Sequence, residues 1–172
     1  MRINLHVIVI GAGLTGSFFL KEMIAYLHMK QENLIRTDIT VFDPGSIGKE
    51  DLGAVYIRED LGQNRALLLS ELLKEQYDYE VTAVPGDFSV GSPVLQISKR
   101  DYVFMVDCSD GSIPGDYRTE WKKLSAKRKL YLKFADAKLY LDDGSGTEPF
   151  FFKIRKRKAK ILSGSIWKEC FW

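Results

Sequence analysis

The sequence predicts an α/β protein built on an open, mostly parallel β-sheet with a short antiparallel C-terminal extension. Three observations support this prediction. Residues 5–10 (LHVIVI) form an apolar, β-branched run closed by Gly11, as expected for a strand buried on both faces. Strand and helix patterns then alternate up to about residue 135, which is typical of a parallel sheet. Beyond that point the apolar segments are short and lie between polar turns.

The individual elements follow from hydrophobic spacing and from Gly and Pro punctuation. Apolar residues between 18 and 27 recur at helical spacing, and a second helix is expected from Asp60 to about Gln76. Asp43-Pro44-Gly45 ends the second strand in a loop. The expected strands are 5–10, 38–42, 80–84, 102–106 and 129–134 in the parallel part and 137–141, 150–154 and 159–162 in the extension, with a third helix at 116–127.

The length and composition indicate a globular protein. The 172 residues suit one α/β domain over 1–135, with a strand or hairpin extension over 136–172 packed on it. No apolar run approaches the ~18–20 residues of a membrane span, and residues 1–10 resemble a core strand, not a signal peptide. Two cysteines, Cys108 and Cys170, are too few for a disulfide framework or a four-thiolate zinc site, so a reduced, cytoplasmic protein is expected.

The net charge of +2 conceals an asymmetry between the two halves of the chain. Residues 1–86 contain 8 Lys or Arg against 12 Asp or Glu, whereas residues 87–172 contain 17 against 11. The run at 153–160 (KIRKRKAK) follows three phenylalanines, a combination found in proteins that bind single-stranded nucleic acid. We prefer the alternative that it is an edge strand whose lysines prevent aggregation.

A glycine pattern marks the first candidate site. Gly11, Gly13 and Gly16 are spaced as Gly-x-Gly-x-x-Gly between a strand and a helix, the context in which this pattern binds nucleotide phosphates. The first glycine permits the turn, the second lets backbone approach phosphate, and the third packs helix against strand. Asp43 ends the second strand, where a carboxylate can accept hydrogen bonds from ribose hydroxyls. The alternative interpretation is that no nucleotide binds here. The glycines would then form only a turn, and Asp43 would only begin the turn that follows the strand.

A second acidic element follows the fourth strand. Asp107 and Asp110 lie at the carboxyl edge of the predicted sheet, where open α/β sheets bind ligands. Two carboxylates cannot enclose a metal ion, but one is enough for Mg²⁺ that is also held by phosphate oxygens and water. Capping of the next helix is the alternative role.

Four segments in chain order resemble the ThiF/MoeB superfamily of ubiquitin-activating-type adenylating proteins. They are GAGLTGS, DITVFDPGSIGKEDLG, EDLGQNRA and DYVFMVDCSDG, within roughly residues 4–120. The resemblance implies a Rossmann-like, doubly wound fold that binds ATP and Mg²⁺. It also implies adenylation of the C-terminal glycine of a ubiquitin-like or sulfur-carrier protein, by a homodimer or a heterodimer.

The resemblance assigns roles to individual positions. Asp43 would bind the ribose, and Asp110 would hold Mg²⁺. Arg65 stands where the family has a phosphate-contacting lysine, which keeps the charge but changes its geometry. Arg65 and Asp110 are therefore the expected catalytic residues. The remaining nucleotide-binding residues would be Gly11, Gly13, Leu14 and Gly16.

The chain departs from the family pattern Asn-Leu-x-Arg-Gln after the second strand. Asp51 replaces the Asn, and Ala54 stands where the Arg would be. Loss of a cation and gain of a carboxylate should weaken triphosphate binding and slow transfer by several powers of ten, unless nearby Arg58 compensates. A catalytically degenerate subunit that serves as a binding or scaffold partner is therefore an alternative function.

A nicotinamide- or flavin-binding Rossmann protein is a further alternative, because the glycine loop and Asp43 also fit it. Neither His6 nor His28 is placed for proton transfer, and we expect both to be structural. Cys108 is expected in the core, and the aromatic neighbours of Cys170 argue against a nucleophilic role for that thiol.

Overall fold

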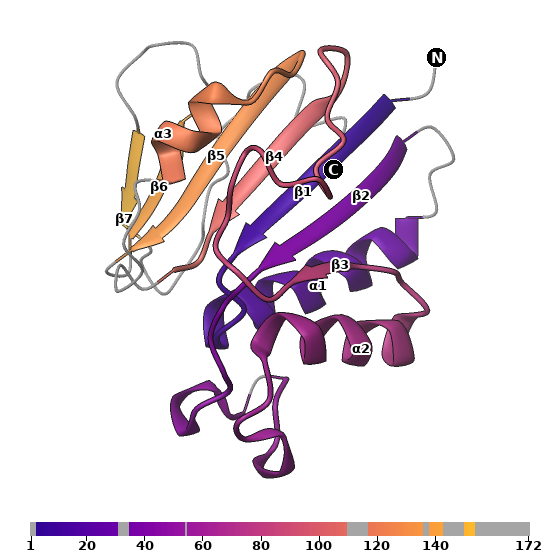
Figure 1. The fold of residues 1–172 in the computed structure, drawn as a ribbon, viewed down its shortest axis with the longest axis vertical. Helices are drawn as coiled ribbons and strands as arrows, with labels where there is room; N and C mark the ends of the chain where they lie inside the picture. The colour runs from indigo at the N-terminus through magenta and orange to yellow at the C-terminus, as the bar shows by residue number, and fades with distance from the viewer. Residues whose placement is uncertain are drawn as a thin grey trace.

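The computed structural model describes residues 3–30, 35–53, 55–109, 117–135, 138–142 and 150–153. These residues contain a seven-stranded sheet with the order β3-β2-β1-β4-β5-β6-β7 (Figure 1). The five strands from β3 to β5 in this order pair in parallel, and β6 and β7 add to the β5 edge by antiparallel pairing. The predicted α/β, Rossmann-like fold with an antiparallel extension is confirmed. The strands are β1 (Ile3–Ile10), β2 (Ile35–Phe42), β3 (Thr82–Val84), β4 (Tyr102–Asp107), β5 (Arg128–Ala135), β6 (Lys138–Asp142) and β7 (Phe150–Lys153).

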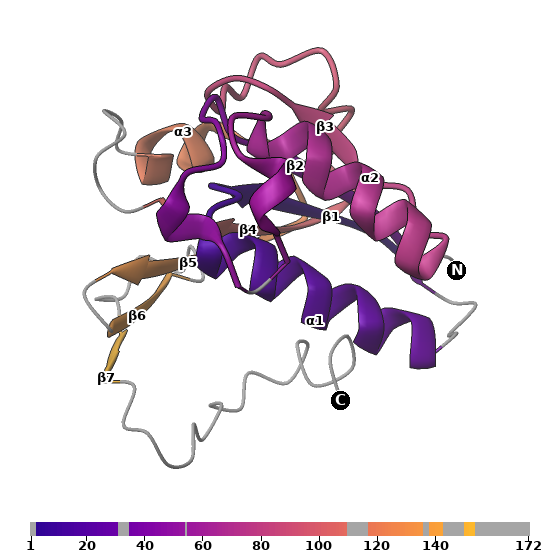
Figure 2. The same cartoon turned by 90° about the horizontal axis from the view of Figure 1, so that it is seen from below.

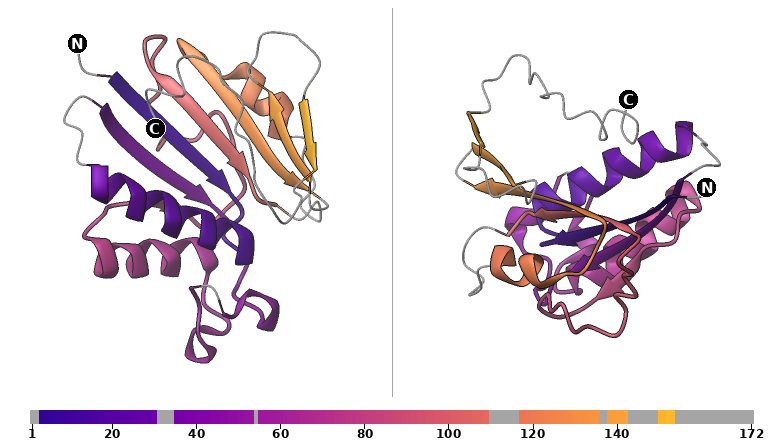
Figure 3. Two further views of the ribbon diagram at one scale, coloured as in Figure 1. Left: turned by 180° about the vertical axis from the view of Figure 1, so that it is seen from behind. Right: turned by 90° about the horizontal axis from the view of Figure 1, so that it is seen from above.

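Helices cover both faces of the sheet. The described helices are α1 (Leu14–Lys30), α2 (Arg65–Tyr77) and α3 (Tyr117–Lys123). Alternate residues of β1 point to opposite sides, so Val7 packs in the core under α1 and α2, whereas Ile8 packs with Trp121 of α3. Views from below and from above place α1 and α3 on opposite sides of the sheet (Figures 2 and 3). The continuous apolar run at 5–10 therefore reflects burial on two faces.

The second helix begins five residues later than predicted. Residues 58–60 instead form a short 3-10 turn, η2 (Arg58–Asp60), and Gly62 follows with a φ of 87°. The Asn64 side chain then caps α2 by accepting a hydrogen bond from the Leu67 N–H. An amide cap of this kind satisfies an otherwise free helical N–H, and it sets the true start of the helix.

Other boundaries differ by a few residues. The predicted helix 116–127 is described over Tyr117–Lys123, because the chain leaves the helix at Leu124 and the Lys127 N–H bonds the Asp101 carbonyl near the start of β4. The predicted strand 80–84 is shortened to Thr82–Val84. The predicted strand 159–162 lies outside the described residues.

The sheet order creates a switch point beside β1. The chain passes from β1 to β2 and β3 on one side, and β4 and β5 lie on the other side. In open α/β sheets, ligands bind beyond the carboxyl ends of the strands at such a point. The segment between β2 and α2, which contains η2 and a similar turn η1 (Lys49–Asp51), projects beyond this end of the sheet (Figure 1). No helix in the described part of the chain is long and apolar enough to cross a membrane.

Candidate functional site

The glycine loop lies at the switch point. Two of its glycines are required there, one by its backbone conformation and one by close packing. Gly11 has a φ of 87°, and a Cβ on Gly16 would lie 1.8 Å from the Gly11 carbonyl oxygen. A Cβ on Gly13 would meet only the Oδ1 of Asp51, at 3.0 Å. Gly11 and Gly16 thus shape the loop, whereas Gly13 presents its backbone to the site. Leu14, the fourth predicted loop residue, begins α1 and is about half exposed.

Asp43 ties the glycine loop to the end of β2. Its Oδ2 accepts a hydrogen bond of 2.6 Å from the Ala12 N–H, and its Oδ1 accepts one of 2.7 Å from the Gly45 N–H. The structure thus brings Asp43 against the glycine loop, and the carboxylate is buried. Its role toward a ribose remains a prediction.

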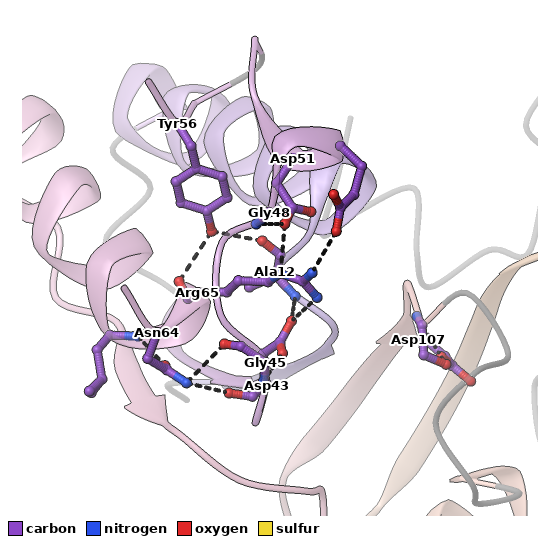
Figure 4. A network of polar contacts seen from close by, with 12 residues as sticks. Ala12, Asp43, Gly45, Gly48, Asp51, Tyr56, Asn64, Arg65 and Asp107 are labelled. Carbon is purple, nitrogen blue, oxygen red and sulfur yellow. Dashed lines mark hydrogen bonds and ion pairs between the residues drawn. The ribbon is translucent and has the colours of Figure 1, made fainter. Parts of the chain in front are cut away.

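Arg65, the expected phosphate-binding cation, is surrounded by carboxylates. Its Nε donates a hydrogen bond of 2.9 Å to Asp51 Oδ2. The two terminal nitrogens lie 3.8 Å from Asp43 Oδ2 and 3.6 Å from Glu50 Oε1. Figure 4 shows the Arg65 guanidinium between the side chains of Asp43 and Asp51. One positive charge therefore faces three negative ones, which is the opposite of the charge balance that a polyphosphate requires.

The contacts of Asp51 in the site could not be predicted from the sequence. Its side chain is 5% exposed, and its Oδ2 accepts hydrogen bonds from Arg65 and from the Gly48 N–H at 2.8 Å. Its Oδ1 points toward Gly13. The substitution relative to the family Asn is visible in the sequence, but the pairing with Arg65 depends on how the 43–64 loop folds. Ala54, the other departure, lies outside the described residues.

Tyr56 is a site residue that the sequence analysis missed. Its hydroxyl lies 2.7 Å from the Ala12 carbonyl oxygen and 3.1 Å from the Arg65 carbonyl oxygen. Burial raises the pKa of this phenol, and the charges of Asp43 and Asp51 raise it further. Tyr56 is thus a neutral hydrogen-bond donor that joins the glycine loop to the start of α2. The one feature of the sequence that could have pointed to Tyr56 is the presence of an aromatic residue in a polar loop.

Asp107 at the end of β4 belongs to a separate network (Figure 4). It is completely buried and accepts hydrogen bonds from Ser109, from the Tyr131 hydroxyl at 2.6 Å and from Lys133 Nζ at 3.1 Å. These partners occupy its acceptor sites, so Asp107 is a structural carboxylate. Asp110, the predicted Mg²⁺ ligand, lies outside the described residues, as does the run 154–160. Among the residues described, no His, Cys, Asp and Glu side chains form a group that could hold a metal ion.

Four further sequence candidates lie in the described part. His28 on α1 and Arg58 in η2 are exposed, whereas Cys108 and His6 are placed as structural residues. The pKa of the Cys108 thiol is raised by burial and by the neighbouring Asp107 charge, which disfavours the reactive thiolate. His6 lies 3.2 Å from Asp101 Oδ2 near the amino ends of β1 and β4, away from the glycine loop. The prediction for Cys170 lies outside the described residues.

The fold and this geometry define a Rossmann-like α/β protein with a glycine loop at the switch point. No protein-family model and no curated protein matches the sequence. Among solved structures, E. coli MccB with ATP aligns with a TM-score of 0.56 and 14% identity, over 84% of this chain and 42% of that chain. E. coli MccB with selenomethionyl MccA aligns with a TM-score of 0.53 and 13% identity, over 80% and 39%. The chain thus spans about two fifths of these structures, and identities this low show likeness of fold alone.

Proposed function

We propose that this chain is a ThiF-like nucleotide-binding domain that holds an adenine nucleotide at the glycine loop. The observation that chiefly supports the proposal is the convergence of Gly13, Asp43 and Arg65 beyond the carboxyl end of β1. The motifs that supply these residues follow the ThiF/MoeB order, and the fold resembles that of MccB solved with ATP.

The nucleoside part of such a ligand fits the residues present. Each oxygen of Asp43 accepts one backbone N–H, and a carboxylate has about four acceptor positions, so ribose hydroxyls could still bind. Arg65 lies across the Asp43–Gly45 turn, with its terminal nitrogen 3.0 Å from where a Cβ of Gly45 would be. The Arg65 side chain must therefore turn aside before a ribose reaches Asp43.

The finer form of the proposal is adenylation of a C-terminal carboxylate. ATP, when bound, would supply the adenylyl group that the acceptor carboxylate takes, with pyrophosphate leaving. Arg65 would then leave its carboxylate partners to neutralise phosphate, and Asp110 would hold the Mg²⁺. The acceptor would be a peptide or a carrier protein ending in glycine; the structural likeness to MccB with MccA supports a peptide. We propose that this activity takes place in the cytoplasm and that a homodimer or heterodimer carries it out.

A second candidate function is a binding subunit without turnover. The observation that favours it is the engagement of Arg65 by Asp43, Glu50 and Asp51. A cation that is already neutralised stabilises a developing phosphoryl charge less well, and such stabilisation is usually the largest catalytic contribution.

Nucleotide binding is tested by calorimetric titration with adenosine, with ATP and Mg²⁺, and with NAD and FAD as competing ligand classes. Gly13→Ala should weaken ATP binding about tenfold or more, because a methyl group would stand where phosphate approaches the backbone. Gly86→Ala is the matched control, since a Cβ there meets nothing within 4 Å. Preference for NAD or FAD, or equal affinities of the two variants, would contradict the proposal.

Turnover is tested by incorporation of labelled pyrophosphate into ATP in the presence of carrier proteins and synthetic peptides that end in glycine. We expect acceptor-dependent exchange that Asp110→Ala abolishes. ATP binding with no exchange for any acceptor tested would favour the binding subunit over the enzyme.

A further inference from the structure

We propose that Asp51 is a specificity-determining residue that makes the site discriminate against nucleotides according to their number of phosphates. The inference rests on the proposed nucleotide-binding function and refines its ligand class. It starts from the placement of the two carboxylate oxygens of Asp51. Oδ1 lies 3.0 Å from where a Cβ of Gly13 would be, and Oδ2 accepts a hydrogen bond of 2.9 Å from Arg65 Nε. A phosphate held by a glycine loop and a cation would use these same two partners.

The Asp51 carboxylate is held firmly in this position. It accepts a hydrogen bond of 2.8 Å from the Gly48 N–H within the turn η1, which fixes its direction. Its side chain is 5% exposed, and that of Arg65 is 23% exposed, so water screens their interaction only in part. Glu50, by contrast, approaches Arg65 at 3.6 Å with a side chain that is 74% exposed. Asp51 is thus an internal anion that occupies the phosphate side of the loop.

This arrangement has different consequences for different ligands. Adenosine carries no charge and needs only the nucleoside side of the site near Asp43. Each added phosphate brings negative charge toward Asp51 and competes with it for Arg65, and repulsion at such distances is strong where solvent is partly excluded. The wild-type protein is therefore expected to bind adenosine at least as tightly as AMP, and AMP more tightly than ATP.

The test compares the dissociation constants for ATP and adenosine at one fixed Mg²⁺ concentration. The quantity compared is the dissociation constant for ATP divided by that for adenosine. This ratio cancels any effect that is common to both ligands, such as the exposure of Asp43 when Arg65 moves. Asp51→Asn keeps the shape of the side chain and removes its charge. We expect this variant to lower the ratio about tenfold or more. Glu50→Gln removes the same charge from the neighbouring exposed position, and we expect it to lower the ratio less than about threefold.

Each outcome of this test is informative. A ratio that is unchanged in Asp51→Asn, or lowered equally in Glu50→Gln, would overturn the inference and leave nucleotide binding intact. Absence of binding of adenosine, AMP and ATP to every variant and to the wild type would instead contradict the proposed function. Because the order adenosine, AMP, ATP is measured on the wild type alone, the inference can be overturned even where Asp51→Asn does not fold.

Discussion

The hydroxyl of Tyr56 lies 2.7 Å from the carbonyl oxygen of Ala12, a residue 44 positions earlier in the chain. This contact fastens the projecting 43–64 loop onto the glycine loop. Asp43 makes the complementary contact, because its Oδ2 accepts the Ala12 N–H. Both polar backbone groups of Ala12 are thus satisfied by side chains from other segments, and the shape of the candidate site depends on them.

Tyr56→Phe should lower the free energy of unfolding by about 1–2 kcal/mol, because it leaves the buried Ala12 carbonyl oxygen without this donor. Urea unfolding followed by circular dichroism measures the change. Tyr79→Phe is the matched comparison, since the Tyr79 hydroxyl donates to the Thr37 carbonyl at 3.1 Å in a partly exposed setting. The smaller loss is expected for Tyr79→Phe, and the reverse order would contradict the role assigned to Tyr56.

Gly16→Ala should destabilise the protein by about 3 kcal/mol or more, or prevent folding, because its Cβ would overlap the Gly11 carbonyl oxygen. Gly86→Ala introduces the same methyl group into open space and should leave the thermal midpoint nearly unchanged. A soluble, folded Gly16→Ala protein with the wild-type midpoint would show that the loop packs differently.

Asp107→Asn should cost about 3 kcal/mol, because a buried carboxylate that binds Tyr131 and Lys133 loses its charge while the partners remain. Asp38→Asn provides the contrast: Asp38 pairs with Arg36 at 3.3 Å on the exposed surface, and its loss should cost less than about 1 kcal/mol. Chemical unfolding of both variants measures the difference. Similar losses would indicate that the Asp107 network contributes little.

Asp101 should give the stability a dependence on acidic pH. Burial opposes its charge, but hydrogen bonds from Ser98, Asn4 and His6 outweigh burial, and its pKa is lowered in the folded protein. A lowered folded pKa stabilises the native state above the unfolded value of about 3.9, and this contribution is lost as the pH falls through the folded pKa. The stability advantage of wild type over Asp101→Asn should therefore shrink on acidification below about pH 4.

Urea titrations of both proteins across the acidic range measure this advantage. The exposed Glu80→Gln variant serves as control and should follow the wild-type curve. A difference between wild type and Asp101→Asn that stays constant down to the acid transition would contradict the linkage.

Local patterns in the sequence determined most of the fold. The apolar run at 5–10 predicted β1, and helical spacing over 18–27 predicted α1, because burial on two faces or on one stripe leaves a direct mark on residue order. The start of α2 was predicted at Asp60, five residues too early. There the apolar pattern extends across Leu61, whereas the cap made by Asn64 depends on a single side-chain contact.

The pairing of charges in the candidate site was decided by the tertiary structure. Through its resemblance to a family, the sequence assigned Gly13, Asp43 and Arg65 to one candidate nucleotide site, and it marked Asp51 as a departure from the family pattern. It could not reveal that Asp51 pairs with Arg65 across 14 positions and faces Gly13. Periodicity records which residues are buried, but it does not record which charges meet. That depends on how an irregular loop is held, here by the contacts of Tyr56 and Asp43 with Ala12.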